Sequence, residues 1–291
     1  MSKATRNRAR TARERIAVQQ AAARKAEQRR RLLIVGGSVG LVIVIVVAFI
    51  VIKNLSKPGP TGSGTLPPAV AKDITNVPAS TLSKVGTGAL PASGLPVKPI
   101  TDTALTSANK PEMLYIGAEY CPYCAAMRWS MAIALSKFGT FGSFKGIHSS
   151  STDVFPSTPS VTFHHQHYSS PYLTFTPVEH QAVNSKRLQP VSKSQQALWA
   201  KYDSDSQGRQ GYPFIDFGNK TIITGPLFSP QVLHGLSWAQ VASKLKNPND
   251  PVAQNVDAAA NYITAAICKM TDGKPGPVCT APQVKALSGK V

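Results

Sequence analysis

The sequence contains an apolar run of 21 residues, 32–52, without a single charged side chain. A helix of this length rises about 30 Å, which matches the hydrocarbon core of a bilayer. A helix buried in a soluble core would keep a polar stripe, which this run lacks. A cleaved signal peptide is the closer alternative, but its apolar region is usually roughly 7–15 residues and ends in an Ala-x-Ala-like site, absent here. We therefore predict a transmembrane signal anchor.

Positive charge is concentrated just before this run. The chain has 32 Lys and Arg against 14 Asp and Glu, and residues 1–31 carry 11 of the basic and two of the acidic side chains. The positive-inside rule places this segment in the cytoplasm and residues 53–291 outside, which excludes a soluble cytosolic protein. We expect a single-pass protein of the cell membrane. The basic tail suits anionic lipid headgroups. A nucleic-acid-binding arm is the alternative, but no nucleic-acid partner is expected.

Composition divides the exterior part into three segments. Residues 53–70 are rich in Pro, Gly and Ser, which is typical of a linker. Residues 71–109 indicate an irregular lead-in, with a short helix near 78–85. Residues 110–291 are long enough for one extracytoplasmic domain with its own core.

Local patterns within this domain favour alternating strands and helices, and therefore an α/β fold. The expected elements are a buried strand at 113–117, a helix from the following motif to Gly139, extended chain over 144–180, a polar helix at 192–202, a hairpin over 213–224, and helices at 229–246 and 251–270.

The motif that carries chemistry is Cys121-Pro122-Tyr123-Cys124, between the buried strand and a run of good helix formers. At a helix N-terminus, free N–H groups and the positive end of the dipole favour a thiolate at the first cysteine. Pro122 suits the first helical position, where no N–H is needed. Cys124, one turn further on, can resolve a mixed disulfide on Cys121. The motif therefore predicts thiol–disulfide exchange.

Two other interpretations of the motif stay open. One is a static disulfide, since thiols tend to pair in an oxidising compartment. The other is half of a zinc site, which needs four ligands that usually come from paired motifs. The remaining cysteines, Cys268 and Cys279, are not spaced as a second C-x-x-C. We expect no metal and no cofactor.

The residues around the motif resemble a known superfamily. Ala118-Glu119-Tyr120-Cys121-x-x-Cys124 is similar to the active-site strand and helix of thioredoxins, and Cys-Pro-Tyr-Cys is the glutaredoxin variant. Thioredoxin-like proteins also place a cis-proline strand against the disulfide, and Tyr212-Pro213 resembles that element. The resemblance implies a cis bond there, with the Tyr212 backbone pairing to substrate. An ordinary proline at the start of a strand is the alternative for Pro213. Glu119, Pro122 and Tyr123 are then neighbours of the active site.

The chain departs from thioredoxins at two points. Thioredoxins carry a buried Asp six residues before the first cysteine, where this sequence has Tyr115. In addition, 91 residues separate Cys121 from Tyr212. The expected fold is therefore thioredoxin-like, with an insertion between the CxxC helix and the cis-Pro strand and with additional C-terminal helices. Tail, anchor, linker and CPYC domain together look most like a membrane-anchored thioredoxin-like family of undefined function in actinobacteria and archaea.

Three weaker signals lie outside the motif. Cys268 and Cys279 enclose a loop rich in Gly and Pro, which indicates a structural disulfide; a second redox pair is the alternative. His164, His165 and His167 fall in a strand-like run, with His165 and His167 on one face. Solvated or hydrogen-bonded histidines are favoured there over a metal site. Glu119 is either a functional acid beside the cysteines or a surface charge.

These patterns lead to one functional hypothesis and one alternative. The hypothesis is a membrane-anchored thiol–disulfide oxidoreductase, an oxidase or isomerase rather than a reductase, acting on envelope or secreted proteins. A reductase would need electrons delivered across the membrane, and any exchange enzyme needs a redox partner to reset it. The alternative is a redox-inactive interaction module of the envelope, with the CPYC cysteines in a static disulfide.

Overall fold

The computed structural model describes residues 63–291 of the chain. The predicted basic tail, the predicted span at 32–52 and most of the predicted linker lie outside these residues. Within 63–291, no helix has both the length and the apolar character needed to cross a bilayer.

Eight α-helices and one short 3-10 helix are present in the described residues. In chain order they are α2 (Pro68–Thr75), α3 (Ala79–Val85), α4 (Pro122–Leu135), α5 (Lys193–Tyr202), the 3-10 helix η1 (Pro230–Leu233), α6 (Trp238–Lys244), α7 (Pro251–Met270), α8 (Gly276–Cys279) and α9 (Pro282–Lys285).

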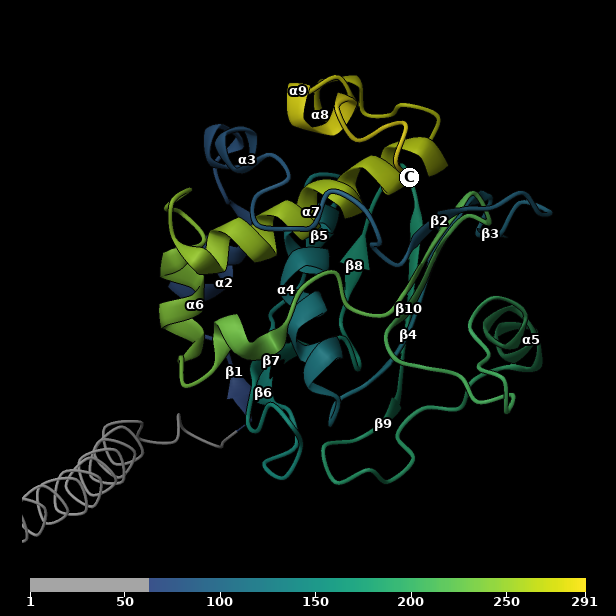
Figure 1. Ribbon diagram of the computed structural model, residues 1–291, viewed down its shortest axis with the longest axis horizontal. Helices are drawn as coiled ribbons and strands as arrows, with labels where there is room; N and C mark the ends of the chain where they lie inside the picture. The colour runs from purple at the N-terminus through teal and green to yellow at the C-terminus, as the bar shows by residue number, and fades with distance from the viewer. Residues whose placement is uncertain (1–62) are drawn as a thin grey trace, which may run out of the picture. The chain divides into compact units, whose positions relative to one another are not determined.

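A six-stranded mixed sheet organises this part of the chain (Figure 1). Its strands are β2 (Val97–Pro99), β11 (Thr221–Thr224), β10 (Phe214–Phe217), β4 (Lys110–Ala118) and β3 (Thr106–Ser107), with β9 (Thr174–Gln181) also paired to β4. In this sheet β4 and β9 run parallel, and the other pairs are antiparallel. The central strand β4 therefore has β10 and β9 as partners.

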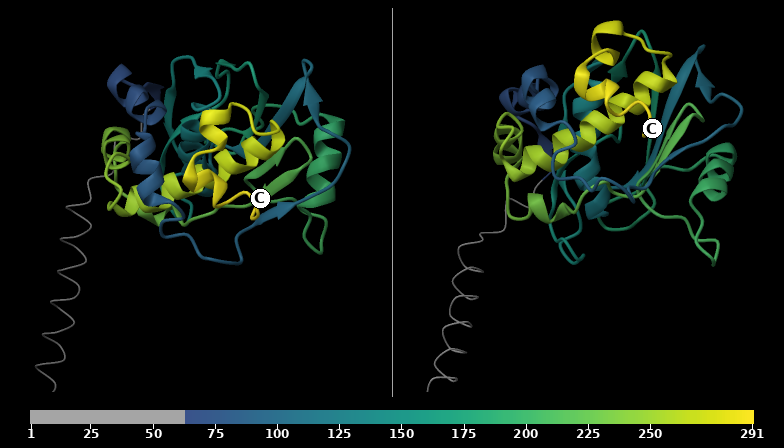
Figure 2. Two further views of the ribbon diagram at one scale, coloured as in Figure 1. Left: turned by 90° about the horizontal axis from the view of Figure 1, so that it is seen from above. Right: turned by 45° about the horizontal axis from the view of Figure 1, so that its top comes forward.

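The two faces of this sheet bury different side chains, because successive strand residues point to opposite faces. Met113 and Tyr115 of β4 belong to the main core, with α4 and α7. Leu114 and Ile116 belong to a smaller core with Trp199 of α5. Figures 1 and 2 accordingly show α4 and α7 on one side of the sheet and α5 on the other. The apolar run of β4 follows from burial on both faces.

Two small sheets complete the described fold. One joins β1 (Gly64–Thr65), β6 (Lys145–His148) and β7 (Pro159–Thr162), and the other joins β5 (Thr140–Phe141) to β8 (Tyr168–Ser169). Hydrogen bonds fasten β7 to α4: Trp129 Nε1 donates to the Pro159 carbonyl at 2.8 Å, and Ser160 Oγ donates to the Ala125 carbonyl at 2.9 Å. These bonds fix the position of β7 beside the CxxC helix.

The α/β class and several local predictions are confirmed. The buried strand, the polar helix and the helix at 251–270 are present as β4, α5 and α7. The hairpin is present as β10 and β11, with Gly218 and Asn219 at positive φ in its turn. The short helix expected near 78–85 is α3, which begins at Ala79.

Four local predictions need correction. β1 and α2 lie in the segment expected to be linker and irregular lead-in, and Val70 and Ile74 of α2 are buried one turn apart. The helix after the CxxC motif ends at Leu135 and is capped by Ser136, four residues before the expected Gly139. The helix expected at 229–246 is interrupted: η1 ends at Leu233, Gly235 has a φ of +72°, and Ser237 caps α6.

The fourth difference is that the histidine run forms a turn, whereas the sequence predicted a strand there. β7 ends at Thr162, and His165 has a φ of +57°. The backbone amide of Phe163 donates to Glu179 Oε1 at 3.2 Å and that of His164 to Thr162 Oγ1 at 3.1 Å. These amides bond to side chains instead of a neighbouring strand, so the ladder stops there.

Candidate functional site

The CxxC motif begins α4 directly after the central strand. Cys121 is the N-cap residue, Pro122 occupies the first turn, and Cys121 Sγ accepts a hydrogen bond from the Cys124 backbone N–H at 3.3 Å. The first cysteine sulfur therefore lies at the positive end of the helix dipole, where a thiolate is stabilised. Tyr123 follows Pro122 in the same turn, and its ring meets the edge of Phe155 at a centroid distance of 5.8 Å.

The two thiols have different environments. Both are free, with Cys121 5% exposed and Cys124 fully buried. The pKa of Cys121 lies below its ordinary value, because the Cys124 thiol and backbone N–H groups hydrogen bond to its sulfur. Burial raises the pKa of Cys124 well above its ordinary value. At neutral pH Cys121 is thus the more acidic thiol, and Cys124 stays protonated.

The cis-proline element lies against this pair. The Tyr212–Pro213 bond is cis, as the resemblance implied, and β10 starts at the next residue with Phe214 paired to Ile116 of β4. Tyr212 packs on the small cluster that contains Cys121 and Cys124. The structure therefore brings both parts of the predicted site together.

Two side chains that the sequence did not single out hold the Tyr212 segment. Trp199 Nε1 of α5 donates to the Gly211 carbonyl at 3.0 Å, and His180 Nδ1 lies 2.6 Å from the Tyr212 hydroxyl. Both come from the segment between the CxxC helix and the cis-Pro strand. That segment therefore supports the site.

Glu119 is buried rather than a surface charge, so that alternative was wrong. Its side chain is 8% exposed, and its Oε1 accepts a hydrogen bond from Thr162 Oγ1 at 2.6 Å. Its backbone N–H donates to the Gln181 carbonyl at 2.8 Å. Glu119 thus connects the loop before Cys121 to both β7 and the end of β9.

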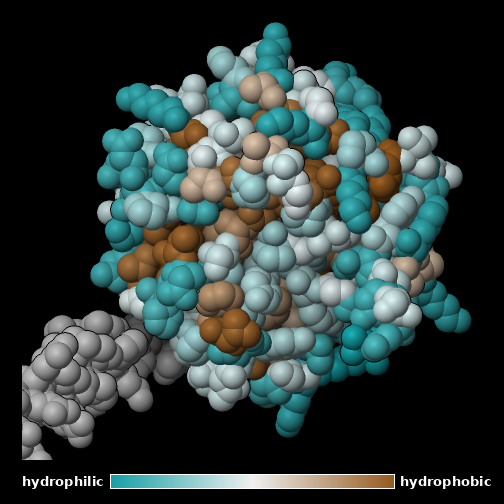
Figure 3. Space-filling view, in the orientation of Figure 1, coloured by the Kyte–Doolittle hydropathy of each residue, from teal (hydrophilic) through white to brown (hydrophobic). Residues whose placement is uncertain are grey.

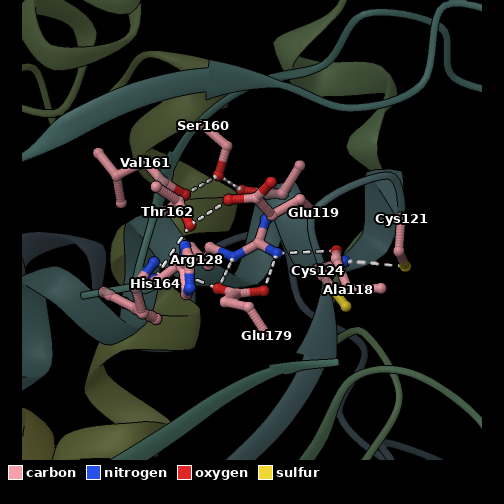
Figure 4. A network of polar contacts seen from close by, with 12 residues as sticks. Ala118, Glu119, Cys121, Cys124, Arg128, Ser160, Val161, Thr162, His164 and Glu179 are labelled. Carbon is pink, nitrogen blue, oxygen red and sulfur yellow. Dashed lines mark hydrogen bonds and ion pairs between the residues drawn. The ribbon is translucent and has the colours of Figure 1, made fainter. Parts of the chain in front are cut away.

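A buried ion pair lies beneath the motif. Arg128 Nη2 of α4 donates to Glu179 Oε2 at 2.6 Å, and Arg128 Nε donates to Oε1 at 2.8 Å. Nη2 also donates to the Ala118 carbonyl at 2.7 Å, so the guanidinium lies between that carbonyl and the Glu179 carboxylate (Figure 4). This pair was not predicted from the sequence. Its one available signal was a lone arginine, four residues after Cys124, in an otherwise apolar helix.

An open hollow lies beside the loop that precedes Cys121. Its volume is about 370 Å³, and it is lined by Glu119, Ser150, Ser151, Ala182, Val183 and Asn184.

The face drawn in Figure 3 shows apolar side chains in patches between hydrophilic ones. In the described part of the chain, the large apolar side chains that stand exposed are Val154 and Val183.

Cys268 and Cys279 form a disulfide between the end of α7 and α8. The end of α7 lies next to the β10–β11 turn, where Lys220 Nζ donates to the Lys269 carbonyl at 3.3 Å. This is the end of β10 opposite Pro213, so the disulfide does not contact the CxxC pair. A structural role fits this placement better than direct exchange with Cys121.

The histidines do not assemble a metal site. The His164 and His165 rings lie 3.8 Å apart in the turn after β7, and His165 and His167 no longer share a strand face. Within residues 63–291 no group of three or more His, Cys, Asp or Glu side chains is placed to hold a metal ion.

The fold and site together define an α/β protein with a CxxC motif at a helix N-terminus and a cis-proline strand beside it. The chain belongs to the family described as "Domain of unknown function (DUF929)", whose model matches residues 97–269. The match includes both site cysteines and Pro213, and it ends before Cys279. No curated protein matches the chain, and no solved structure does.

Proposed function

We propose that this protein is a membrane-anchored thiol–disulfide oxidoreductase with a thioredoxin-like domain outside the cytoplasm. The observation that carries the proposal is the contrast between the environments of the two cysteines of the motif. Cys121 has a lowered pKa at the N-cap of α4, and Cys124 is a buried partner one turn away. This is the pairing that exchange needs: one acidic nucleophile with a small exposed area and one resolving thiol.

The arrangement of elements supports the thioredoxin-like part of the proposal. The central strand β4 leads into the CxxC helix, and β10 begins just after the cis proline and pairs antiparallel with β4. The strands β5 to β9 and α5 form the segment between the CxxC helix and the cis-Pro strand. We assign to this segment the insertion expected from the sequence.

The reaction follows from the two thiols. A substrate thiolate attacks Cys121 Sγ of the Cys121–Cys124 disulfide, and the broken S–S bond leaves its electron pair on Cys124 Sγ. A second substrate thiolate then attacks the substrate sulfur of the mixed disulfide and releases Cys121 as a thiolate. The substrate gains a disulfide, and the enzyme is left with both cysteines reduced. A redox partner in the membrane must remove the two electrons in each cycle.

The location and partners form the second half of the proposal. The uncharged run at 32–52 would anchor the chain in the bilayer, with the basic residues before it in the cytoplasm. The substrates would then be thiols and disulfides of envelope or secreted proteins. No nucleic acid enters this proposal.

Trapping of mixed disulfides tests the proposal. The full chain carrying Cys124→Ser is expressed in cells, thiols are quenched with acid and alkylated, and adducts are separated without reductant. Because Cys124 is absent and cannot resolve them, mixed disulfides on Cys121 persist, and a reductant should cleave them. Cys121→Ser is the matched control and should give none.

A second measurement separates the proposal from the static-disulfide alternative. The wild-type full chain is equilibrated in glutathione buffers, and the redox state of Cys121 and Cys124 is read by alkylation. A pair that titrates in these buffers supports exchange. A pair that stays oxidised throughout, together with no adducts on Cys124→Ser, would leave the redox-inactive interaction module as the function.

A further inference from the structure

Two buried polar groups next to the CxxC pair make no well-formed hydrogen bond among the described residues. They are the hydroxyl of Tyr115 and Nη1 of Arg128. Both side chains are completely buried. Buried donors without a partner are rare in folded proteins, because each loses its hydration without compensation. The burial of the Tyr115 hydroxyl and of Arg128 Nη1 therefore needs a physical explanation.

Tyr115 reaches toward the cysteine end of its strand. Tyr115 and Gly117 point to the same face of β4. A Cβ at Gly117 would lie 2.0 Å from the Tyr115 hydroxyl oxygen, so this hydroxyl lies directly over the glycine. The absence of a side chain at Gly117 lets the ring lie along the strand, with its hydroxyl toward the end that leads to Cys121.

Arg128 is held in place by its other donors. An arginine has five N–H donors. Nε and Nη2 bond to Glu179 and to the Ala118 carbonyl, which leaves the two hydrogens of Nη1 unused. Cys124 is one helical turn earlier on the same face of α4. The guanidinium carbon lies 6.0 Å from the centre of the Tyr115 ring.

The charges around Cys124 agree with this geometry. Burial raises the pKa of the Cys124 thiol, and the positive charge of Arg128 acts in the opposite direction. Burial raises the pKa of Tyr115 well above its ordinary value as well, and the Cys124 sulfur adds to that shift. Tyr115 thus keeps its proton and can only donate to an anion beside it.

We propose that the Tyr115 hydroxyl and Nη1 of Arg128 are donors reserved for the Cys124 thiolate that forms during disulfide exchange. This inference rests on the proposed function, which it deepens by assigning the groups that stabilise the leaving sulfur. In the attack on Cys121, the Cys121–Cys124 bond breaks and its electron pair stays on Cys124 Sγ. No proton is transferred in that step. The two donors stabilise the new negative charge on the fully buried Cys124 sulfur.

This role also accounts for Tyr115, which stands where thioredoxins carry a buried Asp. A carboxylate at position 115 would accept a proton and oppose a thiolate nearby, whereas a tyrosine hydroxyl donates a hydrogen bond to it. A tyrosine at position 115 therefore favours the release of Cys124 as a thiolate more than a carboxylate would, and that release is the step needed to give a disulfide to a substrate.

Tyr115→Phe is the test, because it removes the hydroxyl and keeps the ring. The full chain is oxidised at Cys121–Cys124 and mixed with reduced glutathione, and the mixed disulfide on Cys121 is quantified by mass spectrometry after acid quenching. Loss of a hydrogen bond to a charged group should slow its formation about 10- to 100-fold. Tyr168→Phe is the matched control, since its hydroxyl donates to the Leu135 carbonyl at the far end of α4. Its rate should equal that of the wild type.

A second readout follows Cys124 alone. In a Cys121→Ser background, the pH dependence of Cys124 alkylation gives its pKa, which should rise when Tyr115→Phe is added and stay unchanged with Tyr168→Phe. Equal rates and an equal Cys124 pKa with and without the hydroxyl would overturn the inference. A wild-type chain that does not react with glutathione would overturn the proposed function instead, and the Cys124 pKa would then decide the inference by itself.

Discussion

Arg128 of α4 and Glu179 of β9 form an ion pair in which neither side chain has any exposed surface, with 2.6 Å between Nη2 and Oε2. The pair joins the CxxC helix to the strand that runs parallel to β4. A buried ion pair of this kind is costly to break, because the remaining charge has no water around it.

Arg128→Met should destabilise the chain by about 3–5 kcal/mol, since Glu179 would be left as a buried carboxylate without its cation. The free energy of unfolding of the full chain, measured by urea denaturation, tests this. The double variant Arg128→Met, Glu179→Leu removes both charges and should recover most of the loss. A single variant that unfolds at the wild-type urea concentration would contradict the buried pair.

Asp257 predicts a pH dependence of stability. Its carboxylate lies in α7 with no exposed surface and no hydrogen-bond partner among the described residues, and burial raises its pKa to about 8. The folded chain therefore keeps this proton up to about pH 8, whereas the unfolded chain releases it near its ordinary pKa of 3.8. The folded state binds more protons between these values, so the stability from Asp257 falls as the pH rises from about 4 to about 8.

Asp257→Asn should flatten that slope and stabilise the chain at pH 8. The contribution of one group is at most about 1.4 kcal/mol per pH unit. Urea unfolding at several pH values between 4 and 8 measures it. Asp205→Asn is the control, because hydrogen bonds from Arg209 and Gln207 lower the pKa of Asp205 and it titrates below this range. A slope that is unchanged in Asp257→Asn would show that Asp257 is ionised in the folded chain.

Parts of the fold that depend on local signals could be predicted from the sequence. The central strand, Pro122 at the start of a helix and the Gly218-Asn219 turn each carry their own pattern within a few residues. The same holds for α5, where Ser192 and Gln195 form a capping box. Here local preference and tertiary structure agree.

The rest of the site depends on contacts between distant segments. The sequence gives no sign that Arg128 meets Glu179, 51 positions away, or that Glu119 bonds to Thr162, 43 positions away. The histidine turn has the composition of a strand, and it bends because nearby amides bond to the Glu179 and Thr162 side chains. Helix α2 was not predicted, because it lies in a Pro-rich segment with little helical signal of its own. Its stability comes from the packing of Val70 and Ile74 on the core.

The two site cysteines should differ in reactivity. At pH 7, iodoacetamide should modify Cys121 of the reduced full chain at least about tenfold faster than Cys124, because only Cys121 has a lowered pKa and some exposure. Peptide mapping by mass spectrometry after timed quenching gives both rates. The denatured chain, in which both thiols are equally exposed, is the control, and its two cysteines should be modified at equal rates. Faster modification of Cys124 in the folded chain would contradict the assigned order of attack.

The second cysteine pair should affect stability and leave the exchange chemistry unchanged. The Cys268–Cys279 bond closes a loop with a sequence separation of 11, and a cross-link of this size stabilises a folded chain by about 2–3 kcal/mol. The double variant Cys268→Ser, Cys279→Ser should therefore unfold at lower urea concentration. Its reaction with glutathione at Cys121 should keep the wild-type rate, because the bond lies at the end of β10 opposite Pro213. A slower reaction in this variant, measured where it is fully folded, would instead make the pair part of the electron path.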